Sequence, residues 1–154
     1  MSRPASAPNM AASTADASGY FSRMLRGDVP PPPVATLLGG VVEQLELQAG
    51  LLRARYTATN AFLNPAGTVQ GGMLSAMLDD LTACLVDASL IAGEGVATLN
   101  LNVSFRRPAT VGTLTGEARF IRRGRSVCHV SGVLQQDGKD VATAVATCQI
   151  VRTG

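Results

Sequence analysis

The chain of 154 residues is long enough to bury one hydrophobic core and short enough to form a single domain. Hydrophobic residues make up 46% of it and charged residues 16%, which favours an apolar globular protein over a disordered one. A net charge of +2, together with four Phe, two Tyr and no Trp, argues against a nucleic-acid-binding protein.

The three cysteines, Cys84, Cys128 and Cys148, are an odd number without a C-x-x-C spacing. This pattern predicts free thiols in a reducing compartment rather than a disulfide framework or a zinc site. No apolar run approaches the ~20 residues of a membrane span. Residues 1–16 are small and polar, so we expect a disordered tail that is not a secretory signal. The expectation is therefore a cytoplasmic protein without a membrane contact.

After this tail, residues 17–39 are predicted to form a helical lead-in. Tyr20, Phe21 and Met24 fall on one helical face, and a run of four prolines then breaks the helix. The rest of the chain, residues 40–154, is predicted to form the main domain.

The main domain begins with two predicted strands, over residues 41–49 and 51–59, joined by a hairpin turn at 49–50. A helix over residues 73–93 follows and ends near Gly93. It is apolar nearly all round, so it should be buried against a sheet.

Four further strands are predicted over residues 96–108, 113–124, 126–138 and 141–151. Their lengths and the turns between them indicate an antiparallel meander. The order of two strands, one buried helix and four strands predicts an α+β fold, in which a curved antiparallel sheet wraps around one long central helix.

The entry to the central helix carries a motif. It reads N-x-x-G-T-V-Q-G-G before an apolar helix that contains an aspartate, and it resembles the phenylacetate-degradation type of hotdog-fold acyl-CoA thioesterase. That family shows Asn, then Gly-x-x-His-Gly-Gly, then an acidic residue nine positions after the His. The resemblance covers residues 40–152, and the residues that match the motif are Asn64, Gly67, Gly71, Gly72 and Asp79.

Gln70 stands where the family has its His. Glutamine donates and accepts hydrogen bonds but does not change charge near neutral pH, so Gln70 is not a general base. In the family the acidic residue takes the central role, and the resemblance therefore still implies a thioesterase. Gln70 is expected to orient the loop or the substrate.

Thioester hydrolysis needs a base or nucleophile and hydrogen-bond donors for the oxyanion. The register of the resemblance selects Asp79 as the general base or nucleophile. The adjacent Asp80 points about 100° away around the helix, so it is expected to partner a basic group or a second subunit.

The amides of Gly71 and Gly72 open the helix, where backbone N–H groups have no partner inside the helix, and are expected to bind the oxyanion and substrate. Asn64 is a candidate to hydrogen-bond the thioester carbonyl or the attacking water. Alternatively, it is a turn residue. Thr98 aligns with a family position that holds Ser or Thr beside the attacking water, or else is an ordinary strand residue.

Five arginines are expected to bind the phosphates of coenzyme A from neighbouring strand ends, or else to be solvated. They are Arg106, Arg107, Arg122, Arg123 and Arg125. His129, the only histidine, is interpreted as structural. No metal is expected, because the sequence offers no metal-ligand cluster. No cofactor is expected either, and coenzyme A is part of the substrate and the product.

The distance between Gly71 and Asp79 predicts that two chains form each site together. Eight helical residues span about 12 Å, too far for both to act on one carbonyl, so we expect a homodimer with shared sites and, as in the family, a dimer of dimers. Two other functions stay open: a non-catalytic acyl-CoA-binding hotdog protein and, less favoured without a nearby His, a hydratase or dehydratase. Aryl and medium-chain acyl groups are both compatible with the sequence.

Overall fold

The computed structural model describes residues 18–152; the predicted tail at residues 1–16 lies outside them. The helices are α1 (Tyr20–Leu25), α2 (Pro33–Leu38) and α3 (Gly71–Ala88), with one 3-10 turn at Asn60–Phe62. The strands are β1 (Val41–Glu46), β2 (Leu51–Ala58), β3 (Glu94–Phe105), β4 (Gly112–Arg123), β5 (Val127–Gln136) and β6 (Lys139–Arg152).

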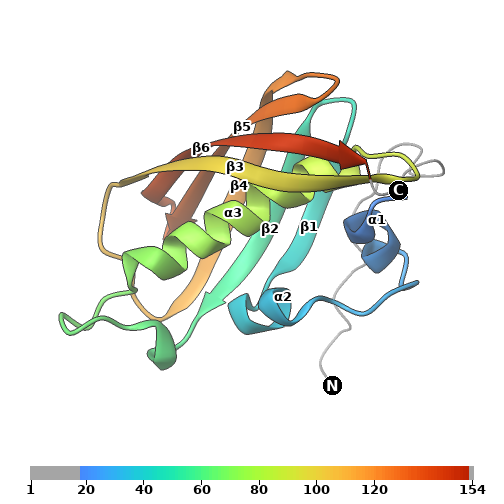
Figure 1. Ribbon diagram of the computed structural model, residues 1–154. Helices are drawn as coiled ribbons and strands as arrows, with labels where there is room; N and C mark the ends of the chain where they lie inside the picture. Colours follow the sequence, from blue (N-terminus) through green and yellow to red (C-terminus); the bar gives the residue numbers. More distant parts are fainter. Residues whose placement is uncertain (1–17, 153–154) are drawn as a thin grey trace.

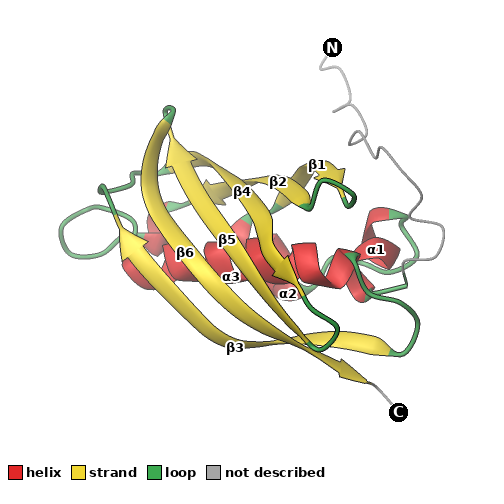
Figure 2. Cartoon of the chain, turned by 90° about the horizontal axis from the view of Figure 1, so that it is seen from above, coloured by secondary structure: helices red, strands yellow, loops and turns green. Residues whose placement is uncertain are grey.

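The six strands form one antiparallel sheet in the order β1-β2-β4-β5-β6-β3 (Figure 1). The sheet curves, and α3 runs along its inner side, as Figure 2 shows from above. Residues alternate along each strand, so that Leu114 and Ala118 of β4 are buried toward α3 while Arg119 is exposed. The predicted α+β class and the hotdog fold are confirmed.

The predicted meander is wrong at one strand. β3 does not lie beside β4 but pairs with β6 at the far edge of the sheet, over the register Glu94↔Arg152 to Phe105↔Ala142. Strands consecutive in sequence are neighbours only about two-thirds of the time, because pairing is decided by packing between distant segments. Within the described residues, the other edge of β3 has no partner strand.

The central helix approaches the sheet closely at two glycines. A Cβ at Gly116 would lie 2.9 Å from Cδ2 of Leu81, and one at Gly132 would lie 3.1 Å from Cγ2 of Thr82. These contacts fix which side of α3 is buried. The buried residues of α3 are Leu74, Met77, Leu78, Leu81, Thr82, Leu85, Val86 and Ala88.

Two details of the predicted central helix are wrong. It ends at Ala88 with Ser89 as its C-cap, whereas Gly93 lies in the turn before β3, at a φ of 79° that favours glycine. It is also not buried on all sides, because the sheet covers only one side of it. Asp79 and Ala83, one turn apart, lie on the half-buried opposite side.

Both helices of the lead-in pack beneath the main domain. The backbone N–H of Phe21, in the first turn of α1, donates a 2.7 Å hydrogen bond to Oδ1 of Asp87 on α3. Burial raises the pKa of Asp87, against the effect of the backbone hydrogen bonds. Phe21 is buried, whereas Tyr20 is 45% exposed and donates to the carbonyl of Pro30. The lead-in is thus tied to the C-terminal half of α3.

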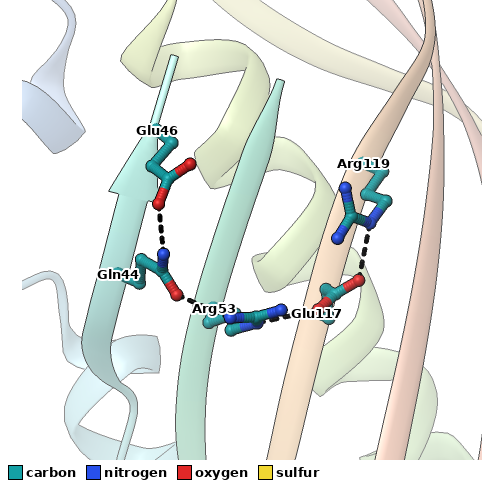
Figure 3. A network of polar contacts seen from close by, with 5 residues as sticks. All are labelled: Gln44, Glu46, Arg53, Glu117 and Arg119. Carbon is teal, nitrogen blue, oxygen red and sulfur yellow. Dashed lines mark hydrogen bonds and ion pairs between the residues drawn. The ribbon is translucent and has the colours of Figure 1, made fainter. Parts of the chain in front are cut away.

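Charged and polar side chains on the outer face of the sheet contact each other, both along a strand and across strands. Figure 3 shows Arg53 between Glu117 and Gln44, with Glu117 also bound to Arg119 and Gln44 to Glu46. Exposed pairs of this kind contribute at most about 1 kcal/mol each. No helix among residues 18–152 is long and apolar enough to cross a membrane.

Candidate active site

The loop before α3 is shaped by Asn64. Its Oδ1 accepts the backbone N–H groups of Ala66 at 3.0 Å and Thr68 at 3.2 Å, and its Nδ2 donates to Oγ1 of Thr68 at 3.0 Å. These bonds form a turn closed by an Asn side chain, with Gly67 at a φ of 77°. Both ends of the Asn64 amide therefore make contacts in its own loop, as in the turn role, and these bonds use one of the two N–H groups of Nδ2.

The same loop presents the start of α3. Gln70 is the N-cap, and its backbone N–H donates to the carbonyl of Phe62 at 2.8 Å while its exposed side chain makes no capping bond. The backbone N–H groups of Gly71 and Gly72 have no acceptor within residues 18–152. Free amides at the positive end of a helix dipole favour a negative charge, so this end suits an oxyanion.

Phe105, at the end of β3, covers Gly71. A Cβ on Gly71 would lie 3.0 Å from Cζ of the Phe105 ring, whereas one on Gly72 would meet nothing within 4 Å. The Phe105 side chain is 56% exposed. It is a site residue that the sequence analysis missed, because its contact with Gly71 depends on where β3 lies in the sheet.

Asp79 contacts the predicted Thr98. The Thr98 hydroxyl donates a 2.8 Å hydrogen bond to Oδ1 of Asp79, which joins the middle of α3 to the edge strand β3. Asp79 is half-buried and Thr98 is exposed, so the pair lies at the surface along the open edge of the sheet. A carboxylate held in this way keeps Oδ2 available for a water molecule.

Asp80 points to the other side of the helix, into the protein. The Tyr56 hydroxyl donates to its Oδ2 at 2.8 Å, and the Cys84 thiol lies 3.8 Å from its Oδ1. The expected basic partner is wrong, because Asp80 faces β2 and its partners are a phenol and a thiol. The sequence analysis did not reveal this pairing, because Tyr56 and Asp80 lie on different elements.

Burial sets the protonation of this group of side chains. It raises the pKa of Asp80, although the hydrogen bonds from Tyr56 and Cys84 act in the opposite direction. It also raises the pKa values of the Tyr56 hydroxyl and the Cys84 thiol well above their ordinary values. Both therefore stay protonated donors at neutral pH, and an ionised Asp80 is less stable than an exposed carboxylate.

The five arginines do not come together within one chain, contrary to the expectation. Arg106 and Arg107 follow the end of β3, and with Gly71 and Phe105 they line a hollow at the start of α3. The other three lie on β4 and in the turn after it, at the opposite end of the sheet and three strands away from Thr98. Seven residues separate Thr98 from Phe105, or about 23 Å of extended strand.

Arg123 differs from the other four arginines. Its guanidinium donates to Oγ of Ser89 at 2.9 Å and to the carbonyl of Ser89, the C-cap of α3. This interaction stabilises the negative end of the helix dipole and explains Arg123 structurally. Within residues 18–152 no side-chain partner is found for the remaining four, Arg106, Arg107, Arg122 and Arg125.

The single histidine lies on the outer face of the sheet. His129 pairs across the strands with Arg122, and its Nδ1 is 3.3 Å from Oγ1 of Thr147. It lines a hollow with Arg122 and Arg125, and Asp79 does not line that hollow. Among the described residues no cluster of three or more His, Cys, Asp or Glu has the spacing of a metal site.

This site has two halves. One half is a carboxylate oriented by a hydroxyl, Asp79 with Thr98, and the other is the pair of free amides at the start of α3. A base and an oxyanion site are the two components that addition of water to a carbonyl requires. In one chain they are about 12 Å apart along the helix.

The chain belongs to the thioesterase superfamily, because the sequence model of that family matches residues 66–143. A crystal structure of a phenylacetic acid degradation-related protein from Ralstonia eutropha JMP134, described as a proposed thioesterase, is 63% identical, with a TM-score of 0.83 over 84% of this chain and 98% of that chain. The expected resemblance to that type of thioesterase is thereby confirmed. No curated protein gave a match.

Two more distant structures share the fold. A thioesterase from Haemophilus influenzae is 19% identical, with a TM-score of 0.70 over 77% of this chain and 82% of that chain. A hypothetical thioesterase protein with coenzyme A from Streptococcus pneumoniae TIGR4 is 21% identical, with a TM-score of 0.66 over 74% of this chain and 87% of that chain.

Proposed function

We propose that the protein hydrolyses acyl-CoA thioesters to a free acid and coenzyme A, with Asp79 as general base. The observation that carries this proposal is the 2.8 Å hydrogen bond from Thr98 to Asp79, which leaves one carboxylate oxygen for water beside the open edge of β3. Membership of the thioesterase superfamily supports the reaction class. The coenzyme A named with the Streptococcus pneumoniae structure supports the carrier.

The reaction balances with these groups alone. Asp79 accepts a proton from water as the water oxygen forms a bond to the thioester carbon, and the carbonyl oxygen becomes an oxyanion held by the amide of Gly71. The C–S bond then breaks, and the thiolate leaves with the proton from Asp79. Gln70 stays neutral in every step, and its proposed role is to orient the loop or the substrate.

The two halves of the site come together if two chains pair through β3. This strand is a long edge, with no charged side chain from Gly95 to Phe105 and with Leu99 59% exposed. Long uncharged edges of this kind favour pairing with another strand. The proposed assembly is a two-fold dimer in which β3 pairs with its own copy.

The contacts within one chain support one register for that pairing. Gly71 lies against Phe105, and Asp79 lies against Thr98. An antiparallel pair that places Phe105 of one chain opposite Thr98 of the other brings the Gly71 amide of the first chain to Asp79 of the second. The two-fold axis then passes between Leu101 and Asn102. Two such dimers form the expected tetramer.

Coenzyme A would lie along this interface. Arg106 and Arg107 line the hollow at Gly71, and neither has a side-chain partner among the described residues, so they are the proposed ligands of its phosphates. Arg122 and Arg125 of the other chain are the second proposed pair, although they lie on and after β4, three strands away from Thr98. Arg123 is not proposed, because it binds Ser89.

Release of thiol from a panel of acyl-CoA substrates tests the function. Hydrolysis by the wild type that is lost in Asp79→Ala supports the proposal. Binding of acyl-CoA without release of thiol, measured by calorimetry, would instead favour the non-catalytic binding protein. Formation of a hydrated product from an enoyl-CoA would favour the hydratase.

A further inference from the structure

An apolar cavity lies beneath α3, between the main domain and the lead-in helices. Its volume is about 170 Å³. Phe21 and Met24 of α1 and Ala35 of α2 form one wall, and β1 and β2 form the opposite wall. The polar groups of Tyr56, Asp80 and Asp87 also line it. The matched family region, residues 66–143, includes neither α1 nor α2, so this part of the wall is contributed from outside that region.

The cavity lies about one helical turn from the proposed catalytic pair, although neither Asp79 nor Thr98 lines it. Ala83, which lines it, is one helical turn after Asp79 and on the same side of α3. Val96, which also lines it, is two residues before Thr98, at the same inner face of β3. Two separate elements therefore place the cavity next to the carboxylate that would activate water. An acyl group whose carbonyl carbon lies at Asp79 has this space within reach.

The volume of the cavity limits the size of the acyl group that it can hold. An apolar cavity of about 150 Å³ in another protein binds one benzene molecule. The space of 170 Å³ here thus holds one six-membered ring or a chain of similar bulk. A longer acyl chain directed toward the lead-in would contact α1 or α2, and α1 is held by the hydrogen bond from Phe21 to Asp87.

We infer that this cavity receives the acyl group, and that α1 and α2 are the specificity-determining element that limits it to a compact group of about one ring in size. This inference rests on the proposed function. Its physical basis is the fixed volume between α3 and the lead-in, the apolar walls, and the position of Ala83 and Val96 beside Asp79 and Thr98.

Two variants change the volume in opposite directions. Ala35→Leu fills the cavity from α2, and Met24→Ala enlarges it from α1. We expect Ala35→Leu to lower kcat/KM for hexanoyl-CoA or benzoyl-CoA by roughly tenfold or more, the usual effect of a group that no longer fits a pocket, and to leave acetyl-CoA nearly unchanged. Met24→Ala should shift the preference toward longer chains. Val34→Leu is the matched control, because Val34 is 47% exposed on the same helix.

Binding separates this inference from the proposed function. The thioether analogue S-hexyl-CoA cannot be hydrolysed, so its affinity is measurable whether or not the wild type is an enzyme. Ala35→Leu should weaken its binding roughly tenfold while binding of coenzyme A itself is unchanged. Equal affinities in the wild type and Ala35→Leu, with Tm and circular dichroism showing a folded variant, would overturn the inference even if acetyl-CoA is hydrolysed. Weakened binding without any hydrolysis would overturn only the function.

Discussion

The Thr98 hydroxyl donates a 2.8 Å hydrogen bond to Oδ1 of Asp79 and so connects the edge strand β3 to the middle of α3. The adjacent residue, Asp80, is held from the opposite side by Tyr56 of β2. Neighbouring carboxylates on one helix therefore occupy different environments. One lies at the open edge of the sheet, where water and substrate have access, and the other faces the interior.

Thr98→Val tests the contact with Asp79. A hydrogen bond to a charged group contributes about 1.5–3 kcal/mol, so its loss should lower kcat by about tenfold or more. KM should change little, because the proposed role is to orient the carboxylate. Thr98→Ser keeps the hydroxyl and should retain most activity. Thr113→Val, in the exposed part of β4, serves as the control. Equal kcat values in Thr98→Val and the wild type would exclude this role.

Asp79→Ala and Asp80→Asn should have very different effects on the reaction. Loss of a general base usually lowers kcat by ~10²-fold or more, and Asp79→Ala is expected to show at least this decrease. Asp80→Asn should reduce kcat far less, because its side chain faces Tyr56. Steady-state kinetics of thiol release measures both. Equal losses in two folded variants would mean that the catalytic register has been assigned to the wrong residue.

Asp80 should make the stability of the protein depend on pH. Burial raises its pKa in the folded state above the ordinary value, so the folded state binds the proton more tightly than the unfolded state. The free energy of unfolding should then be highest below the ordinary pKa and fall as the pH rises through the raised pKa. Asp80→Asn removes this contribution. Urea unfolding between pH 4 and pH 8 should show the variant gaining stability relative to the wild type as the pH rises. Parallel curves for Asp80→Asn and the wild type would contradict the prediction.

Gly71→Pro removes the proposed oxyanion donor while keeping the helix. Proline is tolerated at the first helical position, and Gln70, at a ψ of 134°, already has the extended conformation that precedes proline. Loss of one oxyanion donor should lower kcat by about 10²–10³-fold. Gly71→Ala retains the N–H and displaces only the Phe105 ring, so it should be much more active. Similar activities in the two variants would argue that the amide of Gly71 does not bind the oxyanion.

Mixed dimers test whether the site is shared. Asp79→Ala and Gly71→Pro homodimers should each be nearly inactive. Random pairing after co-expression makes about half of the dimers mixed, and each mixed dimer has one intact site of two, so activity should recover to about a quarter of the wild-type value. Differently tagged chains allow the mixed dimers to be purified and assayed. Inactive mixed dimers would place both residues of each site in one chain.

Local patterns in the sequence determined much of the fold. Alternation and turn residues located the strands, and apolar spacing located α3. The motif from Asn64 to Gly72 marked the start of that helix, and its resemblance to the family's pattern led to the prediction of Asp79 rather than Asp80 as the catalytic residue. These features depend on residues within one or two turns of each other, so they can be read without knowledge of the rest of the chain.

Contacts between distant segments were decided only by the tertiary structure. β3 lies at the edge because it pairs with β6, more than forty positions later for most of its residues. The same placement brings Phe105 over Gly71, and the curvature of the sheet brings Tyr56 to Asp80. Arg123 reaches Ser89 because β4 passes the end of α3. The cavity beneath α3 exists because α1 and α2 fold back under it. Each of these depends on how elements far apart in sequence share one buried volume, and local propensity does not specify that packing.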